Sequence, residues 1–264
     1  NAHRGDVIVG ESGTGLLFRL IRTAALELPE GGKMLSSTLE HPASMSAMKK
    51  WAKNTRRNHI IVEHNDDSGS VDEQAYIKKL TSDVRVVSIV HTSPVTGMTV
   101  DLEKITKEVR NVTPDCIIIV DGIQHSSHGA IDVQKYDIDG YVVSPYKMFS
   151  RHGYGVAWAS DRLCTLNKEQ LADGPFQNWE LGTRDAGSYA TFSDVVDYLD
   201  WLGSNFTESE NTRERLQASS IAIKSHEQEL VDLVINGAED IVGLRNNKKI
   251  RIIGNPASSS REGV

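Results

Sequence analysis

Short, uninterrupted runs of apolar and β-branched residues constrain the fold of this 264-residue chain more than any other feature. The clearest of these runs is Cys116–Val120, and Tyr141–Val143 is a second. A run of this kind, without polar alternation, is typical of a strand that is buried on both faces of a largely parallel sheet. The two runs therefore predict an α/β fold, in which helices cover both faces of the sheet.

Other segments of the chain continue this α/β alternation. We expect further strands at Val7–Val9, His59–Val62, Val84–Val90 and Gly153–Trp158, and helices at Ser44–Lys53, Asp72–Leu80 and Leu102–Val109. An apolar-periodic helix is predicted to start at Thr191–Ser193, and a long amphipathic helix to run from about Ser209 to Ile235. Gly237 suits a left-handed cap at the end of that helix. Lys249–Gly254 is predicted to be a strand.

Polar side chains follow both buried runs at the point where each predicted strand ends. Asp121 comes directly after the first run, and Ser144, Tyr146 and Lys147 come after the second. Ligands of open α/β sheets bind at the carboxyl ends of the strands. With the strand at Gly153–Trp158, we expect three consecutive strand ends to frame one pocket.

An acid and an amine in one pocket match the needs of pyridoxal 5′-phosphate (PLP). This cofactor requires a carboxylate that keeps its pyridine nitrogen protonated and a lysine that holds its aldehyde as a Schiff base. Asp121 and Lys147 are the candidates. Either residue alone has an ordinary explanation, because such an Asp is often a turn former or helix cap and a Lys is usually a solvated surface charge.

The stretch from Ile117 to Val156 resembles the central segment of the class V aminotransferase family, in particular cysteine desulfurases and selenocysteine lyases. Residues 120–124 match the pattern V-D-G/A-x-Q, and residues 153–155 match a G-x-G strand. Ser144 and Lys147 stand where the family has the first and last residues of S-G/A-H-K. The resemblance implies PLP as cofactor, Lys147 as its Schiff-base lysine and Asp121 as the partner of its pyridine nitrogen. It also implies that Gln124 hydrogen-bonds the phenolic oxygen of the cofactor.

The resemblance extends to both sides of this segment. Residues 40–44 are similar to the family element E-H-x-A/S-N/V, which implies that His41 stacks its ring on the cofactor face. Residues 91–97 match H-x-S-N-x-x-G, except that Pro94 replaces the Asn that helps to orient substrate. Thr183 falls in a G-T segment that reaches the phosphate of the neighbouring subunit in the family, which implies a homodimer with a composite site. The alternative for Thr183 is a plain helix-flanking loop.

A glycine-rich turn near the start of the chain is the candidate phosphate site. Residues 7–15 lead from an apolar run into a predicted helix, whose exposed N–H groups and dipole favour an anion. Such a turn also commonly just joins a strand to a helix. The resemblance assigns the phosphate role to Gly13 and Thr14, with hydroxyls from Ser144 and from Tyr146, which replaces the His usual in the family.

The resemblance predicts the domain organisation of a type I PLP fold. We expect a large PLP-binding domain over residues 1–208, with a mainly parallel mixed sheet flanked by helices, a linking helix over 209–236, and over 237–264 the start of a small α+β domain. Residues 1–5 resemble the family stretch N-x-H-R-G, which relatives separate by a helix from the phosphate-binding strand. A missing segment after residue 5 and a truncated small domain are therefore expected.

The expected function is PLP-dependent cleavage of a C–S or C–Se bond in a cysteine-like amino acid. Pro94, Tyr146 and the pair Arg151-His152 depart from the desulfurase pattern, so another class V reaction, such as transamination, epimerisation or a different β-elimination, is the alternative. A PLP-fold binding protein without catalysis is the alternative from another class. A sulfur acceptor protein would be a further partner, but no motif in the chain supports one.

Composition narrows the remaining possibilities. The net charge of −7 with mixed signs argues against a nucleic-acid partner, and no apolar run approaches the roughly 20 residues of a membrane helix. Two cysteines provide no disulfide framework, so a cytoplasmic location is expected. His125 and His128 lack further ligands at zinc spacing, and a loop near the cofactor is the preferred interpretation.

Overall fold

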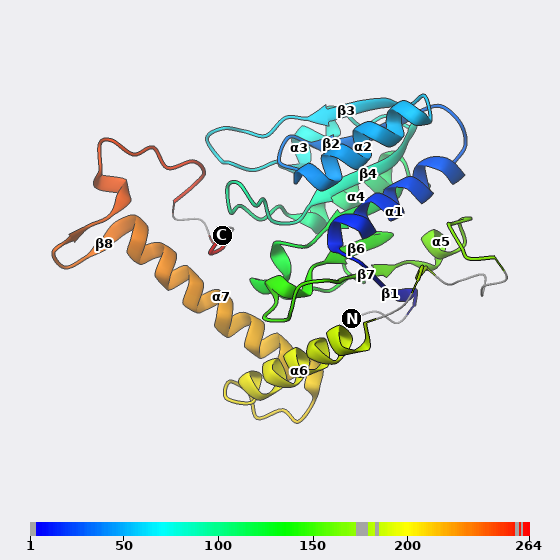
Figure 1. Cartoon of the computed structure of the whole chain (residues 1–264). Coiled ribbons are helices and arrows are strands. Elements are labelled where there is room, and N and C mark those ends of the chain that lie inside the picture. The colour runs from blue at the N-terminus through cyan, green and yellow to red at the C-terminus, as the bar shows by residue number, and fades with distance from the viewer. Residues whose placement is uncertain (1–3, 173–178, 183–184, 257–258, 260) are drawn as a thin grey trace.

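A single seven-stranded sheet organises the chain, and the computed structural model describes residues 4–172, 179–182, 185–256, 259 and 261–264 (Figure 1). The strands are β1 (Asp6–Gly10), β2 (Lys33–Ser37), β3 (Asn58–Val62), β4 (Val84–Val90), β5 (Ile117–Asp121), β6 (Gly140–Val143) and β7 (Gly155–Ala159). Their order across the sheet is β1-β7-β6-β5-β4-β2-β3. The pairs from β6 to β3 are parallel, whereas β7 is antiparallel to both β6 and β1. The mixed, mostly parallel sheet that the sequence predicts is confirmed.

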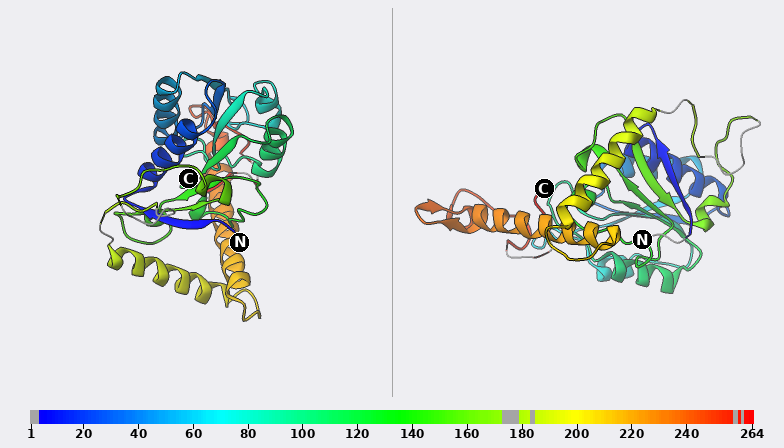
Figure 2. Two further views of the ribbon diagram at one scale, coloured as in Figure 1. Left: turned by 90° about the vertical axis from the view of Figure 1, so that its right-hand side faces the viewer. Right: turned by 90° about the horizontal axis from the view of Figure 1, so that it is seen from below.

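Alternate residues of β5 pack into two separate cores. Ile117 and Ile119 face the core that contains α1 (Gly13–Glu27) and α2 (Pro42–Asn54). Ile118 and Val120 face the opposite core, which contains residues of α3 (Glu73–Ile77) and α4 (Leu102–Val112). Figure 2 shows these two helix pairs on opposite sides of the sheet. All four β5 side chains are fully buried, so the uninterrupted apolar run has the physical cause that the sequence suggests.

Two features of the sheet differ from the sequence-based expectation. β2 was not predicted, because its sequence pairs only two apolar residues with Ser36 and Ser37. Both serines are buried, and their hydroxyls bond to His59 and Glu40, which removes the usual cost of burying them. β7 was expected to end at the site edge. Because it runs antiparallel to β6, its amino end at Gly155 lies there instead.

The C-terminal part corrects three expectations. α6 (Ala186–Gly203) begins five residues before Thr191, because Asp185 caps it by accepting the N–H of Ser188. The long helix α7 (Thr212–Asn236) ends at Gly237, whose φ of 85° is positive but whose ψ of 179° is extended rather than left-handed helical. Lys249–Gly254 is not a strand. Among the described residues no neighbouring segment pairs with it, and a strand needs a ladder partner.

The elements not yet named are short. They comprise α5 (Asp161–Cys164), the 3-10 turns η1 (His125–Ser127), η2 (Pro145–Lys147) and η3 (Leu244–Asn246), and a hairpin of β8 (Gly237–Ala238) and β9 (Ile241–Val242). Figure 1 shows α7 projecting away from the sheet. We retain domain boundaries near residues 208 and 236 as a proposal. Within the described ranges, no helix combines the length and apolarity that crossing a membrane requires.

Candidate active site

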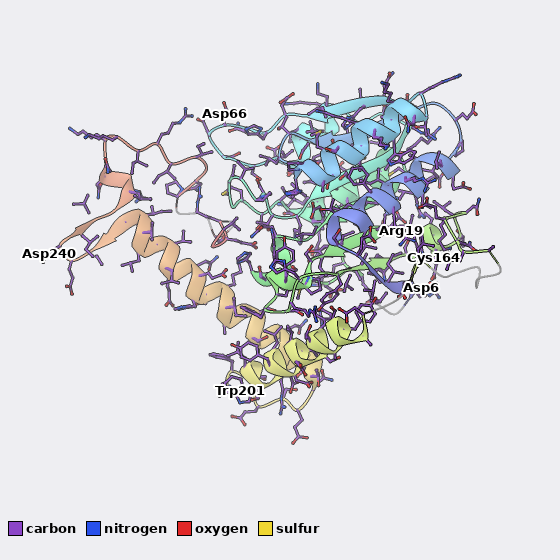
Figure 3. All side chains as sticks on the ribbon, viewed as in Figure 1. Asp6, Arg19, Asp66, Cys164, Trp201 and Asp240 are labelled. Atoms are coloured by element: carbon purple, nitrogen blue, oxygen red, sulfur yellow. The ribbon has the colours of Figure 1, made fainter. Side chains whose placement is uncertain are left out.

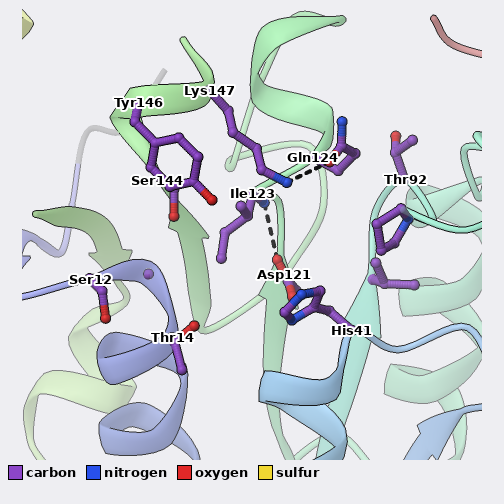
Figure 4. Close-up of a pocket in the computed structure, with 13 residues that line it drawn as sticks. Ser12, Thr14, His41, Thr92, Asp121, Ile123, Gln124, Ser144, Tyr146 and Lys147 are labelled. Carbon is purple, nitrogen blue, oxygen red and sulfur yellow. Dashed lines mark hydrogen bonds between the residues drawn. The ribbon is translucent and has the colours of Figure 1, made fainter. Parts of the chain in front are cut away.

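A cavity of about 180 Å³ lies where β4, β5 and β6 end and α1 begins. Every predicted site residue that the structure describes lines it (Figure 4): Gly13, Thr14, His41, Asp121, Gln124, Ser144, Tyr146 and Lys147. Thr183, the remaining predicted residue, lies outside the described residues. The fold therefore brings together side chains that are up to about 130 positions apart in the sequence, at the edge where α/β sheets bind ligands.

Asp121 ends β5 and is 2% exposed. Its Oδ1 accepts the backbone N–H of Ile123 at 3.1 Å, and its Oδ2 accepts the hydroxyl of Ser44 at 3.1 Å. Burial raises the pKa of this carboxyl, whereas both hydrogen bonds and the nearby charges of His41 and Lys147 act in the opposite direction. The carboxyl is thus held rigidly at the floor of the cavity.

Lys147 reaches the cavity from η2, which follows β6. Its backbone N–H donates to the carbonyl of Ser144 at 2.9 Å, and its Nζ donates to Oε1 of Gln124 at 2.6 Å. Burial lowers the pKa of the amine, while the charge of Asp121 raises it. Because only a neutral amine attacks a carbonyl, a lowered pKa favours covalent chemistry at this nitrogen.

His41 caps the amino end of α2. Its Nδ1 accepts the backbone N–H of Ala43 at 3.1 Å, which fixes the orientation of the ring. The residue is exposed, and Figure 4 shows its ring beside Asp121. One ring face is therefore open to a planar ligand that also reaches Asp121, and aromatic rings favour offset stacking at such places.

The opposite end of the cavity is shaped by two glycines. Gly13 begins α1, and a Cβ there would lie 2.4 Å from the hydroxyl oxygen of Ser144. A Cβ on Gly155 would lie 2.4 Å from the backbone nitrogen of Gly13. Only glycines allow this close approach of the α1 turn to β6 and β7. A helix start that presents free N–H groups beside two hydroxyls, those of Thr14 and Ser144, fits a phosphate.

Tyr146 and Pro94, two of the positions that depart from the desulfurase pattern, line the cavity. Tyr146 is 40% exposed, and its ring stacks on His152 with the ring centroids 4.3 Å apart. Pro94 offers no side-chain hydrogen-bond donor. These two departures therefore contribute to the walls of the cavity, whereas Arg151 and His152 do not line it.

Three histidines lie behind the cavity, two of them in or next to η1. Nδ1 of His91 forms a hydrogen bond of 2.8 Å with the hydroxyl of Tyr141. The His91 ring stacks on that of His125, with the ring centroids 3.6 Å apart. Burial lowers the pKa of His91 far below its usual value, and the charge of His125 adds to this effect. No group of His, Cys, Asp and Glu among the described residues is arranged to hold a metal ion. The third histidine, His128, bonds to both Gln124 and Glu227.

Sequence reasoning missed two buried side chains that support the floor of the cavity. Ser44 donates to Asp121, and Glu40 accepts from the N–H of Val90 and from the hydroxyls of Ser37 and Ser88. Burial, together with the negative charge of Asp121, raises the pKa of Glu40 from 4.5 to about 7. The available signal was their place in the E-H-x-A/S segment, where only His41 was given a role.

Comparisons with known proteins agree with this geometry. The chain is 25% identical to a probable cysteine desulfurase of Mycoplasma genitalium over 163 residues, which cover 62% of this chain and 40% of the relative. It is 25% identical to the aminotransferase-like protein FGM3 of Gibberella zeae over 238 residues, covering 87% and 54%. The chain thus spans about half the length of these relatives.

A solved structure shows the fold of the chain, and a family model shows its family. The crystal structure of the cysteine desulfurase CsdA from Escherichia coli matches with a TM-score of 0.71 and 21% identity, covering 86% of this chain and 56% of that one. This likeness shows the fold, that of type I PLP enzymes. The model of the aminotransferase class-V family matches residues 1–221. The chain therefore belongs to the class V aminotransferase family, whose members depend on PLP.

Proposed function

We propose that this protein is a PLP-dependent enzyme that cleaves the C–S or C–Se bond of a cysteine-like amino acid through a Schiff base on Lys147. The observation that supports this most strongly is that Lys147 Nζ and the buried Asp121 carboxyl share one cavity, whose far end is a glycine-shaped helix start. Bound PLP would supply the electron sink for the reaction.

Each residue then has a defined task around the cofactor. Asp121 keeps a proton on the pyridine nitrogen, and the ring of His41 packs on the cofactor face. Gln124 faces the phenolic oxygen. The phosphate is held at the start of α1 by Gly13 and Thr14, with Ser144 and Tyr146 contributing hydroxyls. The amine of Lys147 would serve as the base that moves protons at the substrate carbons.

Cleavage of the C–S bond is proposed because of the relatives, whereas two residues of the cavity wall favour an alternative. Several relatives are described as cysteine desulfurases or probable cysteine desulfurases. This favours cleavage of the bond between the β carbon and the sulfur. Pro94 and Tyr146 line the cavity and differ from the desulfurase pattern. These two positions favour, as second candidate, another class V reaction on a different amino acid, namely transamination, epimerisation or a different β-elimination.

We also propose that the protein acts as a homodimer with Thr183 reaching the partner's site. Four large aromatic side chains are more than 40% exposed on α6 and near it: Phe149, Tyr198, Trp201 and Phe206. Tyr198 packs against both Phe149 and Trp201, so these three form one patch. Figure 3 shows Trp201 on α6, at the edge of the molecule away from the sheet. Contiguous exposed apolar surface of this kind typically marks an interface.

A single assay separates these functions. The full chain, loaded with PLP, is incubated with L-cysteine and a dithiol reductant that converts the removed sulfur into sulfide. Alanine and sulfide are measured together, with Lys147→Ala as control. We expect equimolar release of both products from the unsubstituted protein only. If the cofactor spectrum is normal and depends on Lys147 but neither product forms, the desulfurase proposal fails and the second candidate applies. If the PLP absorbance spectrum is the same in the unsubstituted protein and in Lys147→Ala, the catalytic proposal fails altogether.

A further inference from the structure

A line of hydrogen bonds leads from the candidate cofactor lysine to the long helix α7. Lys147 Nζ bonds to Oε1 of Gln124 at 2.6 Å, and Nε2 of Gln124 lies 3.3 Å from Nε2 of His128. Nδ1 of His128 then lies 2.9 Å and 2.8 Å from the two carboxyl oxygens of Glu227. His128 and Glu227 are 99 positions apart in the sequence, so this contact exists only because α7 packs against η1.

The direction of every bond in this line follows from its two ends. An ionised carboxylate only accepts, so Nδ1 of His128 must carry a hydrogen that it donates to Glu227. In a neutral imidazole the other nitrogen is then an acceptor, and it receives an N–H of Gln124. The amide of Gln124 is thereby turned so that its oxygen faces Lys147. Every contact in the line then joins a donor to an acceptor.

Both side chains beyond Gln124 lie mostly out of solvent. The His128 side chain is 10% exposed and that of Glu227 is 23% exposed. Water therefore competes weakly for the imidazole nitrogens, and the carboxylate decides which of them carries the hydrogen. A carboxylate that fixes an imidazole in this way also fixes the partner of the second nitrogen, as is common for histidines that bind metals.

We propose that Glu227 and His128 are positioning residues that set which end of the Gln124 amide faces Lys147. The proposal rests on the proposed function, in which Lys147 and Gln124 both contact PLP. Without Glu227 the imidazole is free to carry its hydrogen on Nε2. Gln124 would then turn its oxygen to His128 and its NH₂ group to Lys147, which replaces an acceptor beside the amine by a donor.

Three variants separate this role from a merely structural one. Glu227→Ala removes the acceptor, whereas Glu227→Gln keeps an oxygen that accepts the Nδ1 hydrogen. Glu229→Ala, at an exposed position of the same helix, is the matched control. Thermal unfolding of all three shows whether α7 remains packed.

The first readout needs no cofactor. Side-chain ¹H–¹⁵N correlation spectra are recorded at about pH 8.5, where ordinary imidazoles are neutral, and the His128 signals are identified by their loss in His128→Asn. We expect a single form protonated at Nδ1 in the unsubstituted protein, in Glu227→Gln and in Glu229→Ala. Glu227→Ala should show a second population protonated at Nε2, because only the Lys147 end of the line then orients the Gln124 amide. An unchanged spectrum in Glu227→Ala would overturn the proposal.

The second readout follows bound PLP without measuring activity. In Glu227→Ala we expect a shifted visible absorption band and a PLP dissociation constant raised about 3–10-fold, the value of one lost hydrogen bond. Glu227→Gln and Glu229→Ala should stay close to the unsubstituted protein. If the His128 form changes while band and affinity do not, the positioning role is refuted. Failure of the proposed function is distinguishable, because PLP absorbance would then be insensitive to Lys147→Ala while the His128 spectrum still responds.

Discussion

The substitution Glu40→Gln is expected to remove a pH dependence of folding stability that originates beneath the cofactor cavity. Glu40 is 7% exposed, and its pKa is raised from 4.5 to about 7 by burial and by the negative charge of Asp121. Between these two pH values the folded chain keeps a proton that the unfolded chain has lost. The stabilisation by the neutral carboxyl is therefore fully present below pH 4.5 and is lost as the pH rises to about 7.

The size of the effect follows from the same two values. A difference between 4.5 and about 7 corresponds to about 3 kcal/mol of unfolding free energy, at 1.36 kcal/mol for each tenfold change in proton affinity. Glutamine has the shape of the acid but no charge. Its oxygen can still accept from Val90 N–H and the Ser37 hydroxyl, both of which bond to Oε1 of Glu40. The Ser88 hydroxyl, now an acceptor, meets the new NH₂ group.

Urea unfolding of both proteins between pH 4.5 and 8.5 measures this difference. Near pH 4.5 the two free energies of unfolding should agree within about 1 kcal/mol, the scale of one altered hydrogen bond. Above pH 7 the Glu40→Gln protein should be more stable by up to about 3 kcal/mol. Glu229→Gln, at an exposed site, controls for the general loss of one carboxylate. A difference between the proteins that does not change with pH would refute the reasoning.

Two further predictions concern the proposed phosphate end of the site and the proposed dimer surface. Gly155→Ala should push β7 away from the start of α1, because its Cβ would lie 2.4 Å from Gly13 N. Overpacking of this kind costs about 1–3 kcal/mol, and we expect PLP titration to show binding weakened by about tenfold or more; unaltered affinity would mean that α1 does not hold the phosphate. Trp201→Glu should lower the mass measured by analytical ultracentrifugation to that of a monomer while the circular dichroism spectrum is retained, and an unchanged dimer would exclude the α6 patch as its interface.

The parts of the fold that sequence predicts well are those in which a single local property decides the outcome. β5 was predictable because four consecutive buried side chains leave no room for polar residues. The positions of Asp121 and Lys147 followed from those strands, because side chains after parallel strands meet at one sheet edge. A helix after the glycine-rich turn was likewise predicted, but α1 begins within that turn, at Gly13, because Ser12 caps it.

The parts that sequence missed depend on partners far along the chain. β2 holds two serines in a central strand, which is favourable only because His59 and Glu40 satisfy their hydroxyls. The start of α6 at Ala186 depends on the Asp185 cap. The apolar periodicity that is visible in the sequence begins only after Thr191, so it predicts a later start. The role of Glu227 requires α7 to pack against η1. No local sequence pattern predicts its contact with His128, which is 99 positions away in the sequence.

The two buried acids beneath the cavity have opposite surroundings, and this contrast determines how much charge the site holds. Burial raises the pKa of both carboxyls. At Asp121 this rise is opposed by hydrogen bonds from the Ile123 N–H and the Ser44 hydroxyl and by the charges of His41 and Lys147. Glu40 has no such cation among its influences and instead meets the negative charge of Asp121. Because two adjacent buried carboxyls cannot both ionise cheaply, these surroundings favour the proton on Glu40 and the charge on Asp121. In the proposed function, one negative charge beneath the cavity balances a protonated pyridine nitrogen. Glu40, which does not line the cavity, then helps to reserve that charge for Asp121.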